Sequence, residues 1–208
     1  LYLELGEPLR AESMLELSGT LVEQTNNSQT PLFAHMLKGK LAAYEGRLDD
    51  AERHLTTARE EAVRTEKSDE AATASLALAR LLIGQGRAEE GAAMAAEWQS
   101  APTLKTRAEA SALLGEAGLC GAADDQTTRQ ALETAQSLYE RVGDAFGLWA
   151  VLARRAEHAQ KLGDRRAAER FIQQASRIEA RVRKTVPEEF QESYLSHPRR
   201  KPLLALLG

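Results

Sequence analysis

The chain has 208 residues and a formal net charge of −4, and 43% of its residues are hydrophobic but only 5% are aromatic. This composition is typical of a globular protein, and so mild a charge gives no general attraction to nucleic acid or to an anionic membrane. A single cysteine, Cys120, excludes an internal disulfide and favours a reducing, cytoplasmic compartment, while no apolar run approaches the roughly 20 residues that span a bilayer.

Helical patterns fill the chain, and no run of alternating β-branched residues predicts a strand. We expect the end of one helix and a second helix within residues 1–24, with Pro8 near its start, where proline is tolerated. The first residue, Leu1, lies inside what reads as a helix end, so we expect a piece excised from a longer protein. The further predicted helices are 31–45, 48–66, 69–85, 88–99, 104–118, 126–142, 145–161 and 165–185.

Turn glycines recur at a near-constant spacing between these helices. Gly46 follows Gly6 by 40 residues, and Gly86 follows Gly46 by 40. Gly163 follows Gly86 by 77, which leaves room for two units of similar length, and we expect the intervening turn near Ala123. Each unit is therefore helix, turn, helix, and since one such pair cannot bury its apolar face alone, neighbouring pairs must stack.

Side chains of the same size return at fixed positions after each turn. A small, a large and again a small residue stand five, nine and twelve positions on, along one face of the second helix. Small residues let two helices approach closely while the larger one fills the space between them. The triplets are Ala11, Leu15 and Ser18; Ala51, Leu55 and Ala58; Thr128, Leu132 and Ala135; and Ala168, Ile172 and Ala175. The third unit has Gly91, Ala95 and Trp98 at these positions and departs from the size order.

This pattern resembles the tetratricopeptide repeat (TPR), a helical hairpin with small residues at its packing positions. The residues that carry the resemblance are Gly39, Leu41, Ala51, Leu55 and Ala58 in one unit, and Ala156, Ala168, Ile172 and Ala175 in another. The period near 40 exceeds the standard length of about 34, so longer loops or helix ends are expected. The resemblance implies an all-α, right-handed α-solenoid of about four TPR-like repeats over residues 1–185.

Residues 186–208 form a tail that differs from the repeats and holds three of the six prolines. We expect a capping helix from Pro187 to about Leu195, in which Phe190 and Leu195 cover the last repeat, because a terminal repeat has no neighbour on its outer face. The tail is also similar to segments that follow repeat regions in large bacterial multidomain signalling and transcription regulators.

No constellation predicts catalysis, a metal or a cofactor. The histidines His35, His54, His158 and His197 are not at metal spacing with one another, and no glycine-rich phosphate loop is present. Carboxylates are abundant but are expected on solvated helix faces. Cys120 lies near a turn, without a base beside it, and is expected to be a small packing residue. We therefore expect a protein that is not an enzyme.

Basic residues cluster towards the C-terminal end, at Arg181, Arg183, Lys184, Arg199, Arg200 and Lys201. Such a cluster is the best case for nucleic-acid contact, but no recognition-helix signature accompanies it. We expect these residues to solvate a terminal helix and a linker instead.

The repeat resemblance implies a protein-interaction scaffold or regulatory domain, whose first helices line a concave groove for a protein or peptide partner. Lys40 and Arg80 are equivalent positions one repeat apart, and we expect them to project side by side and to favour an acidic partner. For Phe33, Met36 and Leu76, packing in the core between helices is an equally good interpretation. The candidate groove residues are Phe33, Met36, Lys40, Tyr44, Leu76, Arg80 and Ile83.

An alternative of another class is a sensory domain that binds a small ligand or signalling peptide and relays it to an output domain. An enclosed pocket with convergent polar groups would favour the sensor, and an open groove would favour the scaffold.

Overall fold

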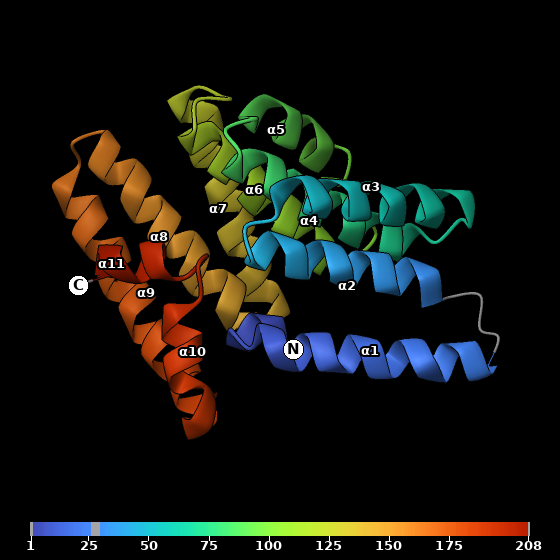
Figure 1. Cartoon of the computed structure of the whole chain (residues 1–208). Coiled ribbons are helices and arrows are strands. Elements are labelled where there is room, and N and C mark those ends of the chain that lie inside the picture. Colours follow the sequence, from blue (N-terminus) through green and yellow to red (C-terminus); the bar gives the residue numbers. More distant parts are fainter. Residues whose placement is uncertain (1, 26–29, 208) are drawn as a thin grey trace.

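The computed structural model describes residues 2–25 and 30–207, which contain helices and no strand (Figure 1). A short 3₁₀ helix, η1, is followed by nine α-helices that form the body of the molecule, and the tail adds a second 3₁₀ helix and two short α-helices. Their bounds are η1 Tyr2–Leu5, α1 Pro8–Thr25, α2 Thr30–Tyr44, α3 Leu48–Arg64, α4 Ser68–Gly84, α5 Ala88–Ala96, α6 Leu104–Leu119, α7 Asp125–Val142, α8 Ala145–Lys161, α9 Arg165–Thr185, η2 Glu188–Phe190, α10 Gln191–Ser196 and α11 Lys201–Leu207.

The predicted helices match the observed ones closely from α2 to α9, because polar caps punctuate the chain. Four helices begin at a residue whose side-chain oxygen accepts a hydrogen bond from a backbone N–H three residues later. These capping residues are Thr103 before α6, Asp124 before α7, Asp144 before α8 and Asp164 before α9. The helix α11 was not predicted.

The turn between α6 and α7 lies at Gly121 and not near Ala123. Gly121 has a φ of +96°, in the left-handed region where Gly6, Gly46 and Gly86 also lie. Glycine reaches this region without the steric cost that a Cβ brings. The prediction was wrong because two extra residues separate Gly121 from the cap of α7.

The predicted triplets form the contacts within the hairpins. Their first residues are all buried, from Ala51 at 0% exposure to Ala11 at 5%. At the hairpin α2–α3, a Cβ added to Gly39 would lie 2.7 Å from Leu55, and at α6–α7 a Cβ added to Gly115 would overlap Leu132. Glycine in the first helix thus makes room for leucine in the second. Trp98 and Ile172 are only partly buried, and the side chains of Leu15 and Ser18 lie outside the described residues.

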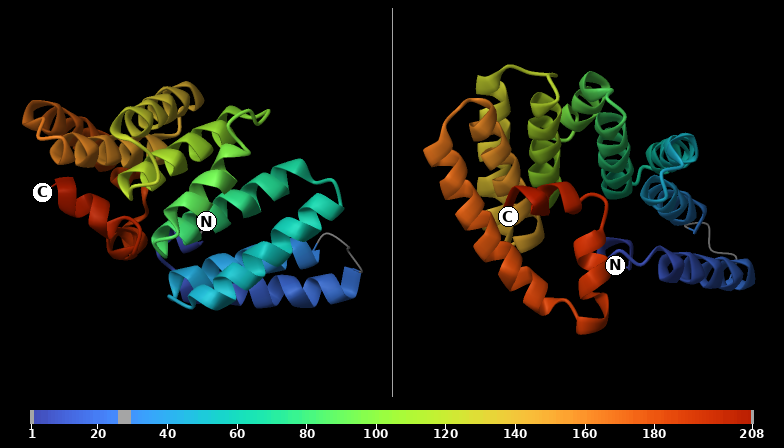
Figure 2. Two further views of the ribbon diagram at one scale, coloured as in Figure 1. Left: turned by 90° about the horizontal axis from the view of Figure 1, so that it is seen from above. Right: turned by 60° about the vertical axis from the view of Figure 1, so that its left-hand side comes forward.

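Each body helix packs chiefly against the next one in the chain, so the hairpins follow one another in space (Figures 1 and 2). The tail returns along this array. The helix α11 packs on α8 and α9, and α10 lies beside η1. Phe190 is 8% exposed and Leu195 packs with it against Trp149 and Val182, so both residues cover the last hairpin as expected.

We expect Ala51→Leu and Ala168→Leu to overpack their hairpins and to lower the free energy of unfolding by about 1–3 kcal/mol each. Both alanines are buried, at 0% and 3% exposure. The control Ala93→Leu changes an exposed position of α5 and should have an effect below about 0.5 kcal/mol. Urea denaturation followed by circular dichroism measures all three. Unchanged midpoints for both buried variants would show that the assigned repeat register is wrong.

Candidate functional site

Four of the predicted groove residues form one stripe along α2. Phe33, Met36, Lys40 and Tyr44 are three or four residues apart, so their side chains leave the helix on the same side. Phe33 is 43% exposed, while the other three are half-buried. Met36 packs against the cluster around Leu32. The stripe therefore has the exposed ring of Phe33 at one end and the half-buried ring of Tyr44 at the other.

Leu76 and Ile83, which were also predicted to face the groove, lie in the core. Leu76 is 1% exposed and Ile83 is 8% exposed, in one cluster with Leu113. Their helix, α4, is enclosed by α3, α5 and α6, so most of its faces are buried. For these two residues the groove prediction is wrong, because neither can contact a partner in the folded chain.

Arg80 reaches across to the next hairpin instead of projecting into an open groove. Its guanidinium donates to Glu109 on α6 at 2.9 Å, and both side chains are partly buried. Burial alone would raise the pKa of Glu109, but the charge and hydrogen bond of Arg80, with smaller effects of Lys40 and Arg199, lower it. Arg80 is therefore paired with Glu109 and is not available to an acidic partner, so the predicted pair of free cations is not present.

A second ion-pair cluster continues this line of charges. Arg154 on α8 lies 3.7 Å from Glu116 on α6 and donates to Glu157 at 2.8 Å. The aromatic ring of Tyr139 borders the line, and burial together with Glu109 raises the pKa of its hydroxyl. Arginines on α4 and α8 thus pair with carboxylates on α6 and α8, so that charges of both signs compensate one another.

The tail contacts this surface where the stripe of α2 ends. The ring of Tyr44 meets the ring of His197 edge to face at 5.3 Å between centroids, and its hydroxyl donates to the carbonyl of Gly6 at 3.2 Å. His197 is 4% exposed. Arg199, two residues on, is exposed, and its positive charge is the smallest of the influences that lower the pKa of Glu109.

The tail also contacts the region of η1 and α1, although the two segments stand at opposite ends of the sequence. The hydroxyl of Ser193 donates to the carboxylate of Glu7. A Cβ added to Gly6 would overlap the backbone carbonyl of Ser193, so the two backbones are in direct contact. The guanidinium of Arg10 lies 4.8 Å from the ring centroid of Phe190.

Two histidines that are 19 residues apart in sequence meet between α2 and α3. The Nδ1 atoms of His35 and His54 are 3.0 Å apart, a hydrogen bond that needs at least one neutral ring. Burial lowers the pKa of His54, and His35, Arg53 and Lys38 add to this effect. The sequence reasoning missed this pair. Pairing the two predicted helices antiparallel about their turn would have placed them together.

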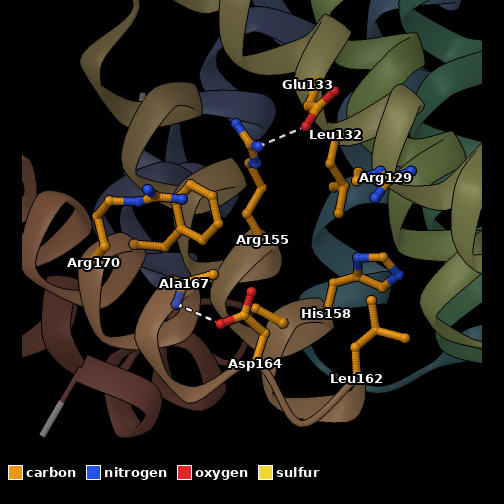
Figure 3. A pocket seen from close by; sticks show the side chains of 11 residues that line it. Arg129, Leu132, Glu133, Arg155, His158, Leu162, Asp164, Ala167 and Arg170 are labelled. Atoms are coloured by element: carbon orange, nitrogen blue, oxygen red, sulfur yellow. Dashed lines mark hydrogen bonds and ion pairs between the residues drawn. The ribbon is translucent and has the colours of Figure 1, made fainter.

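A pocket of about 200 Å³ lies between α7, α8 and α9 (Figure 3). Arg155 pairs with Glu133 at 2.9 Å, and its guanidinium carbon lies 4.3 Å from the ring centroid of Phe171. Asp164 accepts from the backbone N–H of Ala167. Arg129, Arg170 and the buried His158 complete the polar lining.

A larger hollow of about 560 Å³ opens beside α5, which is only nine residues long and leaves parts of α6 and α7 uncovered. Its lining is mainly alanine and threonine, with Gln99 and Gln130 at its edge. These side chains offer little chemistry beyond hydrogen bonds.

Within residues 2–25 and 30–207, no group of three or more histidine, cysteine, aspartate or glutamate side chains is placed to hold a metal ion. Nor does any described helix combine the length and the apolar character needed to cross a bilayer. No family model matches the chain, and no curated protein sequence matches it.

We expect the chain to lose stability as the pH falls from 7 to 5. Unfolded His54 takes up a proton near pH 6.5, whereas the folded ring does so only at lower pH, so protons favour the unfolded state in this interval. His54→Asn keeps a polar contact to His35 but removes the titration, and should flatten this part of the profile. Urea denaturation midpoints at pH 7.5, 6.5 and 5.5 measure this pH dependence. The same change of midpoint with pH in the parent chain and in His54→Asn would contradict its assignment to His54.

Proposed function

We propose that the chain is a non-catalytic protein-interaction domain, a right-handed TPR-like solenoid of four hairpins, α2–α3 to α8–α9. Its partner is a protein or peptide segment that binds the face of α2 that carries Phe33, Met36, Lys40 and Tyr44. The turn spacing, the buried triplets and the sequential packing of the hairpins support the solenoid assignment. Repeat arrays of this kind present extended surfaces for peptide segments.

The observation that carries the proposal is the chain's own tail. A short segment with aromatic, polar and basic side chains already lies against Tyr44 and Glu7. A surface that accommodates this segment in the folded chain has the shape and chemistry to accommodate a peptide. The exposed ring of Phe33 extends the same stripe beyond the tail. Exposed aromatic side chains of this kind are common anchors in interfaces.

The resemblances of the repeats and of the tail support a place for this domain in a larger cytoplasmic bacterial regulator of signalling or transcription. In such a protein, the domain would hold a partner or another domain of the same chain. Nucleic acid is not proposed as its ligand, because Arg200 of the basic tail is buried and no recognition-helix signature accompanies the basic residues.

A sensory domain for a small ligand is the second candidate function. The pocket in Figure 3 favours it, since arginines from three helices and the buried His158 converge there. The two carboxylates of the pocket already have partners. Glu133 pairs with Arg155, and Asp164 accepts a hydrogen bond from the backbone at the start of α9. Loss of ligand response in Arg129→Gln and Arg170→Gln would assign a sensory role to this pocket.

For any partner that the immobilised chain captures, we expect Phe33→Glu to abolish capture, since it places a charge on the exposed end of the stripe. The control Val63→Glu changes a residue of α3 that is 61% exposed and should keep full capture. Both variants should fold, as circular dichroism can verify. Equal capture by both variants would place the interface away from α2.

A further inference from the structure

The pocket between α7, α8 and α9 is positively charged, although the chain as a whole is acidic (Figure 3). Its lining holds three arginines and two carboxylates, which gives a net charge of +1 when the histidine is neutral. The net charge of the whole chain is −4. A concave site with this excess of positive charge attracts an anion. The charged and titratable residues of the lining are Arg129, Arg155, Arg170, Glu133, Asp164 and His158.

Arg155 is held in place by several neighbours. Its guanidinium donates to Glu133 at 2.9 Å and to the side-chain oxygen of Gln136, and its central carbon lies 4.3 Å from the ring centroid of Phe171. Only 17% of the side chain is exposed. A guanidinium that is already fixed loses little conformational freedom when a ligand binds beside it, and its remaining N–H groups can donate to an oxyanion.

The other two arginines carry charges that no carboxylate contacts directly. Among the residues that the structure describes, neither Arg129 nor Arg170 has an ion-pair partner, and both side chains are exposed. Arg170 lies 5.2 Å from the ring centroid of Phe171, so this ring has two guanidinium groups beside it. Figure 3 shows Arg129 and Arg170 on opposite sides of Arg155. Two cations at the rim of the pocket can therefore turn towards a ligand.

Below this rim the pocket is apolar and small. Leu132, Ala159 and Phe171 are buried, at 1%, 7% and 8% exposure, whereas Leu162 in the same lining is left 49% exposed. The volume of about 200 Å³ is below the roughly 300–1,000 Å³ of pockets for drug-sized ligands. A ligand that fits is therefore small, and it needs an apolar part as well as a negative charge.

His158 adds a polar group that the fold leaves without a hydrogen bond. Its side chain is 5% exposed and belongs to the lining of the pocket. The Nε2 atom is buried and makes no hydrogen bond to a described residue, and a carboxylate oxygen of Asp125 lies 3.4 Å away without the alignment of one. Buried polar atoms nearly always have a partner, so this ring has hydrogen-bonding capacity left for a ligand.

We propose that this pocket binds a small molecule with one carboxylate and an apolar body about the size of one aromatic ring. The carboxylate is held by Arg129, Arg155 and Arg170, and the body lies on Leu132 and Phe171. A single negative charge balances the net charge of the lining. This inference goes beyond the interaction face of α2 and does not depend on it. It gives the second candidate function, the sensory domain, a class of ligand.

The probe is benzoate, titrated into the ¹⁵N-labelled full chain at pH 7.5 and followed by two-dimensional NMR. We expect saturable shifts of the backbone amides of Ala167 and Phe171. Benzyl alcohol has nearly the same shape but no charge and should bind much more weakly. Phenyl phosphate should also bind more weakly than benzoate, because its second charge faces Glu133 and Asp164. Equal affinity for benzoate and benzyl alcohol, tighter binding of phenyl phosphate, or no benzoate shifts up to about 20 mM would overturn the proposal.

The double variant Arg129→Gln, Arg170→Gln should bind benzoate about tenfold more weakly than the parent chain, since it loses charge-assisted hydrogen bonds to the carboxylate. Its matched control is Arg141→Gln, Arg181→Gln, which removes the same charge from exposed positions of the same two helices outside the pocket lining and should keep the parent affinity. Equal affinity of the two double variants would refute the inference. That result would leave the interaction face standing, because Phe33→Glu tests it separately on α2.

Discussion

No helical hairpin in this chain can bury its apolar surface by itself, and the rest of the structure follows from that constraint. Within each hairpin, small residues such as Gly39 and Gly115 let the two helices approach until a leucine of the second helix fills the gap. The outer faces then remain apolar, so each hairpin needs the next one. Such an array propagates readily but always leaves two ends that must be covered.

The tail covers one end and reaches the other. Its helix α11 shares a core with α8 and α9, while α10 lies against η1, at the start of the chain. Covering the ends thereby places the tail against Tyr44, Glu7 and the backbone of Gly6. The property that completes the fold, a segment held against Tyr44 and Glu7, is also the property from which we infer a peptide-binding function.

The sequence predicts the helices well because glycine turns and aspartate caps mark their ends. The size pattern of the triplets also holds in α7, although the turn before this helix lies at Gly121 and not where it was predicted. It cannot tell which apolar residues of α4 face a groove, because α4 is enclosed on several sides, and so Leu76 and Ile83 were misplaced. Nor does it reveal the partner of Arg80, which is 29 residues away, or the contact between Glu7 and Ser193, which are 186 residues apart. Such contacts depend on how the hairpins are placed relative to one another, which no local pattern encodes.

The central claim is that the tail joins the two ends of the array, and a distance between spin labels tests it most directly. Leu9, which is 75% exposed on α1, and the exposed Glu192 on α10 are suitable positions when Cys120 is replaced by serine. Their sequence neighbours Arg10 and Ser193 both take part in the junction. The account predicts a single narrow distribution at short distance in double electron–electron resonance. A broad distribution centred at long distance would contradict it.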